Sequence, residues 1–220
     1  PMNDSQVLAT IEEVVRAMLL KAEGSAIEGI GMGIPAIPDG PPGKATTLVA
    51  PNLPVLEHHD LKQHLEAVFG LPVEMENDAN CFIAGEHRFG AARGVNDCIG
   101  LTLGTGIGCG ILLNGRVRRG ATWHCGEIWD LPLDDGRGLE EVLSGAGISR
   151  RAKTSSAAEA ARAAREGNPD ALAAWPEYGH RLGWLLAVLQ RIIDPELFVL
   201  GGSIRESLDL FEQPMRAAAG

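Results

Sequence analysis

The chain has 220 residues, 45% of them hydrophobic, which is enough for a substantial core in one large or two small domains. Its 19 basic and 29 acidic residues give a formal net charge of −10, which disfavours binding to nucleic acid or to an anionic membrane. No apolar run reaches the ~20 residues that span a bilayer and the start lacks the basic residues of a signal peptide, so we expect a cytoplasmic protein without a membrane partner.

The first third of the chain predicts two helices and a strand. Apolar residues repeat at helical spacing from Val7 to Leu20, which indicates an amphipathic helix. Ile27 to Ile34 predicts a short buried strand, and the prolines and glycines of residues 35–43 predict a loop after it. A second helix is expected from Asp60 to Phe69, with Gly70 as its C-cap.

The middle of the chain alternates strands with polar or glycine-rich turns. Leu71 to Met75 predicts a strand that ends in a polar tip, residues 76–80, followed by a helix to about Phe89. Cys98 to Leu103 and Cys109 to Leu113 predict two further strands, joined by a glycine loop at 104–108 and closed by a hairpin turn at Asn114-Gly115.

The last third is mostly helical. Residues 155–174 are rich in alanine and predict a helical hairpin interrupted at Gly167-Asn168-Pro169. A mostly apolar helix is expected from Tyr178 to Ile193, and a buried strand from Leu197 to Leu200 that ends at Gly201-Gly202. Strands that alternate with helices predict α/β layers, with ligands at the carboxyl ends of the strands.

Four cysteines, none in a Cys-x-x-Cys pair, predict reduced thiols in the core rather than zinc or redox chemistry; they are Cys81, Cys98, Cys109 and Cys125. The glycines from Gly104 to Gly110 suggest a backbone that approaches a phosphate closely, although a hairpin with a merely glycine-rich tip explains them as well. Their spacing is not that of a dinucleotide site, and no helix follows, which disfavours a dehydrogenase.

Three acidic residues are candidates for chemistry. Asp78 stands where a strand ends and a helix begins, so it is either a helix N-cap or a general base that takes a proton from an attacking hydroxyl. Glu127 and Glu140 are either solvated surface acids or acceptors for sugar hydroxyls, because carboxylates are strong acceptors at neutral pH.

A series of motifs resembles the ROK family (repressors, uncharacterised reading frames and kinases), in its sugar-kinase branch, from about Ile30 to Ser203. Its core is formed by Glu76-Asn77-Asp78-Ala79-Asn80, Gly90-Ala91-Ala92-Arg93-Gly94 and Leu101–Gly108. The other motifs are Pro51-Asn52-Leu53-Pro54, Asn114-Gly115, Arg119-Gly120-Ala121, Gly126-Glu127-Ile128, Ser144-Gly145, Asp194-Pro195-Glu196 and Gly201-Gly202.

The resemblance implies an actin-like (ribonuclease H-like) α/β fold with two lobes, 1–94 and 95–220. It implies an ATP-dependent hexose kinase of glucokinase type that uses Mg²⁺ with ATP and forms a homodimer. Asp78 would be the general base, and Asn77, Glu127 and Glu140 would hold the sugar hydroxyls. The nucleotide would face Gly104, Thr105, Gly106, Gly201 and Gly202.

Two departures from the family pattern carry predictions of their own. The family's Gly-Glu-x-Gly-His segment is here Gly126-Glu127-Ile128-Trp129-Asp130, and residues 134–140 replace its cysteine cluster, so we predict no structural zinc. Asp130 would take over a sugar hydroxyl, while Trp129 would either cover the sugar ring or be an ordinary core tryptophan.

The second departure is that the family's Asp-x-Gly-Gly-Thr turn is not found, since the one Gly-Gly pair of the sequence is Gly201-Gly202. We expect a chain shortened at its N-terminal strands and at its C-terminus. The alternatives to a kinase are a sugar-responsive transcription regulator and a catalytically silent sugar-binding protein. The sequence does not identify the hexose, because epimers differ only in the direction of one hydroxyl.

Overall fold

The computed structural model describes residues 4–39 except 23 and 25, residues 47–49, residue 57 and residues 60–220. The chain divides into two compact units. Unit 1 comprises Pro1–Cys81 with Arg119–Cys125, and unit 2 comprises Phe82–Arg118 with Gly126–Gly220. A segment near the middle of the sequence therefore folds with the N-terminal unit.

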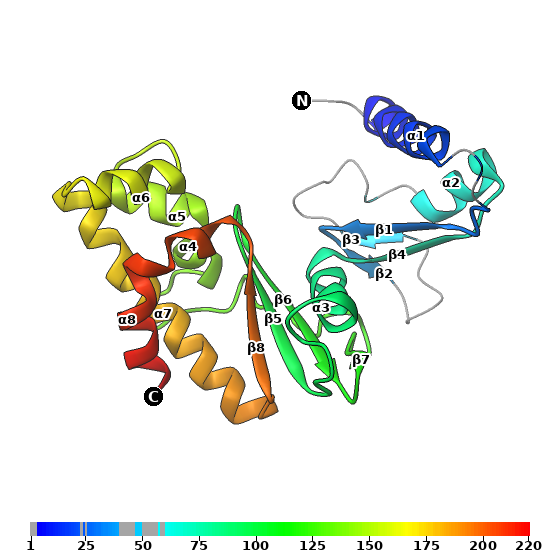
Figure 1. Cartoon of the computed structure of the whole chain (residues 1–220). Coiled ribbons are helices and arrows are strands. Elements are labelled where there is room, and N and C mark those ends of the chain that lie inside the picture. Colours follow the sequence, from blue (N-terminus) through cyan, green and yellow to red (C-terminus); the bar gives the residue numbers. More distant parts are fainter. Residues whose placement is uncertain (1–3, 23, 25, 40–46, 50–56, 58–59) are drawn as a thin grey trace. The chain divides into compact units, whose positions relative to one another are not determined.

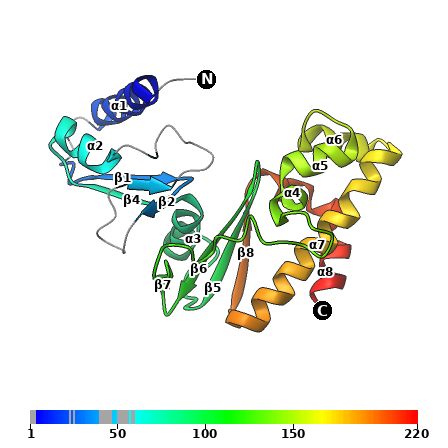
Figure 2. The same cartoon turned by 180° about the vertical axis from the view of Figure 1, so that it is seen from behind.

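Unit 1 consists of two helices and two small sheets. A parallel pair of strands places Ile30 opposite Val73 and Ile34 opposite Asn77, and a second pair is antiparallel. Figures 1 and 2 show both helices on the same side of the parallel pair. The elements are α1 (Asp4–Lys21), β1 (Ile30–Ile34), β2 (Ile37–Asp39), β3 (Thr47–Val49), α2 (Leu61–Phe69) and β4 (Val73–Asn77).

The core of unit 1 explains why its helices form where they do. Leu61 and Leu65 of α2 are fully buried against Ile34 and Val73 of the strands, and the apolar face of α1 packs on the same cluster. Helix α2 begins one residue later than predicted, at Leu61, because Asp60 is its N-cap and Asp60 Oδ1 accepts the Gln63 N–H. The predicted C-cap at the other end is confirmed. Gly70 closes the helix with a left-handed φ of 65°.

The predicted loop at 35–43 is wrong in part, because β2 begins only three residues after β1 ends. The loop was predicted partly because of Pro38, since a proline has no N–H to donate to a neighbouring strand. A two-stranded ribbon such as β2–β3 consists only of edges, where a proline is tolerated. The strand after α2 was predicted two residues too early, at Leu71 to Met75, since β4 begins at Val73 and continues to Asn77.

Unit 2 is built on a four-stranded sheet in the order β7-β6-β5-β8, in which β5 is antiparallel to β6 and parallel to β8. Its strands are β5 (Cys98–Leu103), β6 (Ile107–Leu113), β7 (Arg116–Val117) and β8 (Leu197–Gly201). Helix α3 (Asp78–Phe89) covers one side of the sheet, and the C-terminal helices lie on the other side (Figures 1 and 2). These are α4 (Leu139–Leu143), α5 (Gly145–Ala152), α6 (Ala157–Arg165), α7 (Pro169–Ile193), the 3₁₀ helix η2 (Ser203–Ser207) and α8 (Leu208–Ala219).

Helix α7 corrects the prediction that residues 155–174 and 178–193 belong to separate helical elements. It runs for 25 residues with Pro176 inside it. The rings of Trp175, Tyr178 and Phe211 are almost fully buried, with centroids 5.0 to 6.2 Å apart. This packing against α8 lies directly beside the proline and offsets the hydrogen bond that the proline removes.

The four cysteines are all free thiols, but they are not all in the core. Cys98 and Cys109 are buried in the central strands of unit 2, as predicted. Cys81 is exposed in the first turn of α3, so the prediction of a core thiol is wrong there. Among the described residues, no helix combines the length and the apolar character needed to cross a membrane.

Candidate active site

The junction of β4 and α3 carries the candidate general base. Asn77 is the last residue of β4, and its Oδ1 accepts the N–H groups of Ala79 at 2.9 Å and Asn80 at 3.2 Å. These are the bonds of a helix N-cap, so Asn77 caps α3 and Asp78 is the first helical residue. The Asp78 side chain is exposed, and its Oδ1 accepts the Ala79 N–H at 2.9 Å.

Glu76, immediately before this junction, binds three groups with its two carboxylate oxygens. Oε1 accepts the Asn77 N–H and an Nδ2–H of Asn80, each at 3.0 Å. Oε2 accepts the Nε–H of Arg119 at 2.6 Å. The guanidinium of Arg119 also lies 5.3 Å from the ring centroid of Trp123. No role was predicted for Glu76 or Arg119, although both lie inside motifs that resemble the family.

The glycine loop between β5 and β6 is a tight turn at residues 104–106. The N–H of Gly104 donates to the Gly106 carbonyl at 3.0 Å, and the Gly104 carbonyl accepts the Gly145 N–H at 2.8 Å. Thr105, at the tip, is exposed. A Cβ added to Gly104 would meet no atom within 4 Å, so the packing inside the chain does not require glycine at this position.

Glu140 lies against the same turn. Its Oε2 accepts the Ile107 N–H at 3.1 Å, and a Cβ at Gly106 would collide with this carboxylate. Glycine at 106 therefore leaves room for the end of the Glu140 side chain, which a larger residue would displace. The structure thus brings a residue predicted to bind sugar next to a turn predicted to bind nucleotide, a proximity that the sequence did not indicate.

Internal packing also explains the two glycines at the end of β8, Gly201 within the strand and Gly202 directly after it. A Cβ at Gly201 would collide with the ring of Phe82, and one at Gly202 would collide with the backbone of Leu103. Gly202 also has a φ of 85°, a conformation that side chains other than hydrogen rarely allow. Of the four glycines predicted to face the nucleotide, Gly104 alone has open space where a Cβ would be.

The segment after Gly126 connects two further candidates. The indole N–H of Trp129 donates to Glu127 Oε2 at 3.1 Å, and the Trp129 carbonyl accepts the Glu140 N–H at 2.9 Å. Trp129 is 37% exposed, which argues against the alternative of an ordinary core tryptophan. Asp130 is exposed beside it.

A network of charged side chains holds the loop that leads to α4. Arg137 binds Asp135 at 2.6 Å and Glu177 of α7 at 2.5 Å, and Arg181 of α7 binds Asp134 at 2.8 Å. Hydrogen bonds from Arg137 lower the pKa of Asp135 from its ordinary 3.8 to about 2. In the described part of the chain, no group of three or more His, Cys, Asp or Glu side chains is placed to hold a metal ion.

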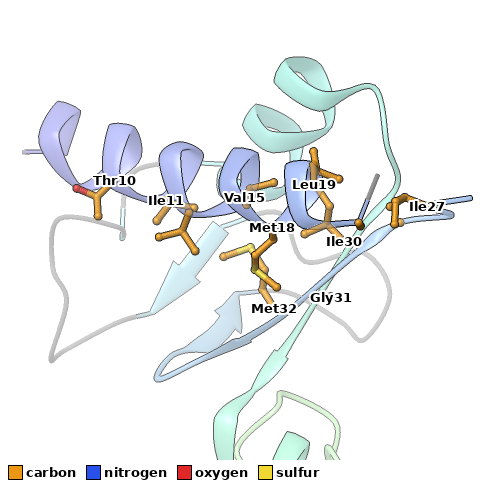
Figure 3. A pocket seen from close by; sticks show the side chains of 12 residues that line it. Thr10, Ile11, Val15, Met18, Leu19, Ile27, Ile30, Gly31 and Met32 are labelled. Atoms are coloured by element: carbon orange, nitrogen blue, oxygen red, sulfur yellow. The ribbon is translucent and has the colours of Figure 1, made fainter. Parts of the chain in front are cut away.

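A separate cavity of about 420 Å³ lies in unit 1 between α1 and β1, and it is lined almost entirely by apolar side chains. Figure 3 shows Met18 and Leu19 of α1 on one side and Ile30 and Met32 of β1 on the other. None of the predicted site residues lines this cavity.

The predicted site residues therefore fall into two groups, one in each unit. Unit 1 holds Asn77 and Asp78, and unit 2 holds Glu127, Asp130, Glu140 and the five residues predicted to bind nucleotide. The motif Pro51-Asn52-Leu53-Pro54 lies outside the described residues.

Comparison with known proteins yields consistent matches over most of the chain. A sequence profile described as the ROK family matches residues 2–219. A glucokinase of Streptomyces coelicolor is 32% identical over an alignment 236 residues long. The alignment covers 90% of this chain and 74% of that protein. The crystal structure of a ROK family glucokinase from Streptomyces griseus, in complex with glucose and AMPPNP, matches with a TM-score of 0.82 and 30% identity, over 100% of this chain and 78% of that one.

A structure of a different functional class shares the fold. A ROK family transcriptional regulator, a homolog of the E. coli MLC protein, matches with a TM-score of 0.81 over 99% of this chain and 62% of that one. Its sequence identity is 22%, so this likeness concerns the fold alone.

Proposed function

The chain belongs to the ROK family, and from this membership we propose that it is an ATP-dependent sugar kinase that phosphorylates a hexose, with Asp78 as the general base. Its mixed α/β fold is the actin-like fold of the ROK sugar kinases, as predicted. The glucokinase matches favour glucose as the first sugar to test. In keeping with the family, we also propose a homodimer in the cytoplasm.

The exposed carboxylate of Asp78 is the observation that carries this proposal. Asn77 takes the capping role, so helix formation does not need the Asp78 side chain. An exposed carboxylate that follows directly after a strand and is not the helix cap can accept the proton of a sugar hydroxyl as that hydroxyl attacks the terminal phosphoryl group. No cation in the described part of the chain forms an ion pair with Asp78, so the carboxylate is available as a base.

We propose that Asn77, Glu127, Asp130 and Glu140 bind the sugar hydroxyls. Carboxylates and amides suit this task because the hydroxyls are hydrogen-bond donors. Glu140 would use Oε1, since its Oε2 already accepts the Ile107 N–H. Trp129 holds Glu127 through its indole N–H and would fix the orientation of that carboxylate.

For ATP, we propose contacts with the turn at Gly104, Thr105 and Gly106 and with Gly201 and Gly202. The open space above Gly104 lets a phosphate approach the backbone closely. The other glycines would contribute backbone groups whose positions internal packing fixes. Magnesium would arrive with the nucleotide, where it neutralises charge between the phosphates.

The test is an assay of ADP release, with Mg-ATP and millimolar glucose, mannose, fructose, N-acetylglucosamine or N-acetylmannosamine. We expect turnover with at least one of these sugars. Calorimetry with the same sugars separates the alternatives, because sugar binding without turnover would favour the regulator or the silent sugar-binding protein. Absence of turnover with all five sugars would contradict the kinase proposal.

A further inference from the structure

Resting on the proposed function, we infer that Glu76 and Arg119 are positioning residues for the reaction. Their ion pair would hold the junction of β4 and α3, and with it Asp78, in the geometry that proton abstraction needs. Neither side chain is assigned a part in the chemistry itself.

The Glu76 carboxylate binds one backbone group before Asp78 and one side chain after it. It accepts the N–H of Asn77, the residue before Asp78, and the side-chain amide of Asn80, two residues after it. The Glu76 side chain is only 17% exposed, so water competes weakly for these bonds. Asp78 is exposed, and no described cation holds it, so its position depends on the neighbours that Glu76 fixes.

Arg119 supplies the positive charge that this carboxylate needs. An acid that is largely withdrawn from solvent is costly unless it is paired, and the Nε–H of Arg119 binds Glu76 Oε2 at 2.6 Å. The planar guanidinium also lies 5.3 Å from the centroid of the Trp123 ring. An arginine can form both contacts at once, whereas a lysine would retain the charge but not the planar geometry.

Trp123 is itself fixed, which makes the Arg119 contact rigid. The side chain of Trp123 is buried at 8% exposure, and its φ is 65°, rarely adopted by a residue other than glycine. The Cys125 N–H donates to the Arg119 carbonyl at 3.3 Å and closes the segment on itself. Residues 119–125 thus form a closed segment whose first residue, Arg119, forms the ion pair with Glu76.

The experiment compares four single variants and one double variant of the whole protein. Glu76→Gln keeps an acceptor for Asn77 and Asn80 but can turn an amide towards Arg119, and Arg119→Met keeps the length of the side chain without its charge. Arg119→Lys tests rescue by charge. Arg118→Met is the matched control, because Arg118 is the exposed neighbour, and its side chain makes no ion pair within the described part of the chain.

We expect kcat to fall about 10–100-fold in Glu76→Gln and in Arg119→Met, since a displacement of about 1 Å can cost that much in rate. The melting temperature should stay near that of the parent in Glu76→Gln but fall in Arg119→Met, which leaves the Glu76 carboxylate without its cation. Arg119→Lys should recover part of the loss in kcat, and Arg118→Met should behave as the parent. Because the two residues act as a pair, Glu76→Gln/Arg119→Met should lose no more than the worse single variant. Unchanged kcat in either single variant, or additive losses in the double variant, would overturn the inference.

A second measurement keeps the inference testable if the parent protein shows no turnover, which would refute the proposed function instead. Amide hydrogen exchange at Ala79 and Asn80 reports the same junction without a substrate. We expect exchange there to become faster in Glu76→Gln and in Arg119→Met, and to be unchanged in Arg118→Met. Parent-like exchange at both amides in the two test variants would overturn the positioning role, and this readout also decides the case if Arg119→Met is too unstable for kinetics.

Discussion

The two regions predicted to carry chemistry are held in place by different means. At the junction of β4 and α3, side-chain hydrogen bonds and an ion pair fix the backbone around Asp78. At the β5–β6 turn and after β8, glycines let other groups come into direct contact, as Glu140 does at Gly106 and Leu103 at Gly202. The β4–α3 junction therefore depends on contacts between polar side chains. The turn and the end of β8 depend on glycines, whose lack of a side chain leaves room for neighbouring groups.

This difference predicts how each region responds to substitution. At a polar junction, substitutions that keep the size of the side chain should change stability little. Activity should fall when such a substitution removes a charge or a hydrogen-bond acceptor. A region built on glycines is insensitive to charge and is damaged by a single added methyl group. The predictions that follow test this contrast in order of expected effect.

The largest effect is expected for Asp78→Asn, which keeps the shape of the side chain but removes the base. Turnover should fall 10²–10⁴-fold, or about 3–5 kcal/mol of barrier, because general-base catalysis typically contributes that much. The melting temperature should stay close to the parent value, since Asn77 is the cap of α3. Turnover, sugar affinity by calorimetry and melting should be measured on one preparation, and near-normal turnover would end the catalytic assignment.

The next effect concerns stability in the glycine region, with Gly104→Ala as the matched comparison to Gly202→Ala. The second substitution adds a methyl group against the Leu103 backbone at a φ of 85° and should destabilise by about 2–5 kcal/mol. Gly104→Ala adds its methyl group to open space, so the free energy of unfolding should change little. Urea unfolding measures both, and equal losses in the two variants would contradict the packing argument.

A smaller effect should come from Arg137→Met, which tests whether unit 2 also uses polar contacts. Arg137 joins Asp135 to Glu177, so its loss should lower the melting temperature, by less than about 4 °C since exposed ion pairs contribute little. High salt screens such pairs and should narrow the difference from the parent. A difference that persists at molar salt would point to packing of the Arg137 stem instead.

The pH dependence of the same network has a definite sign. Arg137 lowers the pKa of Asp135 from 3.8 to about 2, so ionised Asp135 stabilises the fold above about pH 4. This contribution is lost as the pH falls from 4 towards 2 and Asp135 becomes protonated. Unfolding of Asp135→Asn and of the parent should therefore differ at pH 5 and converge near pH 2, whereas a gap that is constant with pH would refute the assignment.

The smallest expected effect is none at all. If charged side chains rather than zinc hold residues 134–140, a chelator should leave the melting temperature unchanged, and metal analysis of untagged protein should find substoichiometric zinc. One zinc bound per chain would show that the segment from His124 to Glu140 was misinterpreted.

Local patterns made much of the fold predictable. The C-terminal end of α2 was predictable from Gly70, because glycine readily adopts the left-handed conformation that ends a helix. The N-terminal end was predicted within one residue, at Asp60 instead of Leu61. The position of Asp78 between a strand and a helix follows from the switch in hydrophobic period. The continuation of α7 through Pro176 was not predictable, because it depends on aromatic packing between α7 and α8 rather than on local propensity.

The candidate site was predictable residue by residue but not in its connections. Glu76 and Arg119 are 43 residues apart, and no local pattern states that they form an ion pair. Glu140 and Ile107, which are in contact at the β5–β6 turn, are 33 residues apart. Contacts of this kind depend on the tertiary arrangement of strands and loops that are distant in sequence. Composition and motif spacing do not specify that arrangement.

The return of residues 119–125 to unit 1 has a consequence for dissecting the protein. The polypeptide passes from one unit to the other after residues 81, 118 and 125, so no single cut separates the two units. A fragment that ends at residue 81 would lack Arg119 and leave Glu76 without its cation. Proteolytic cleavage near residue 118 or 125 should therefore disturb the β4–α3 junction. Expression of the two units as separate proteins would need a grafted peptide or a circular permutation.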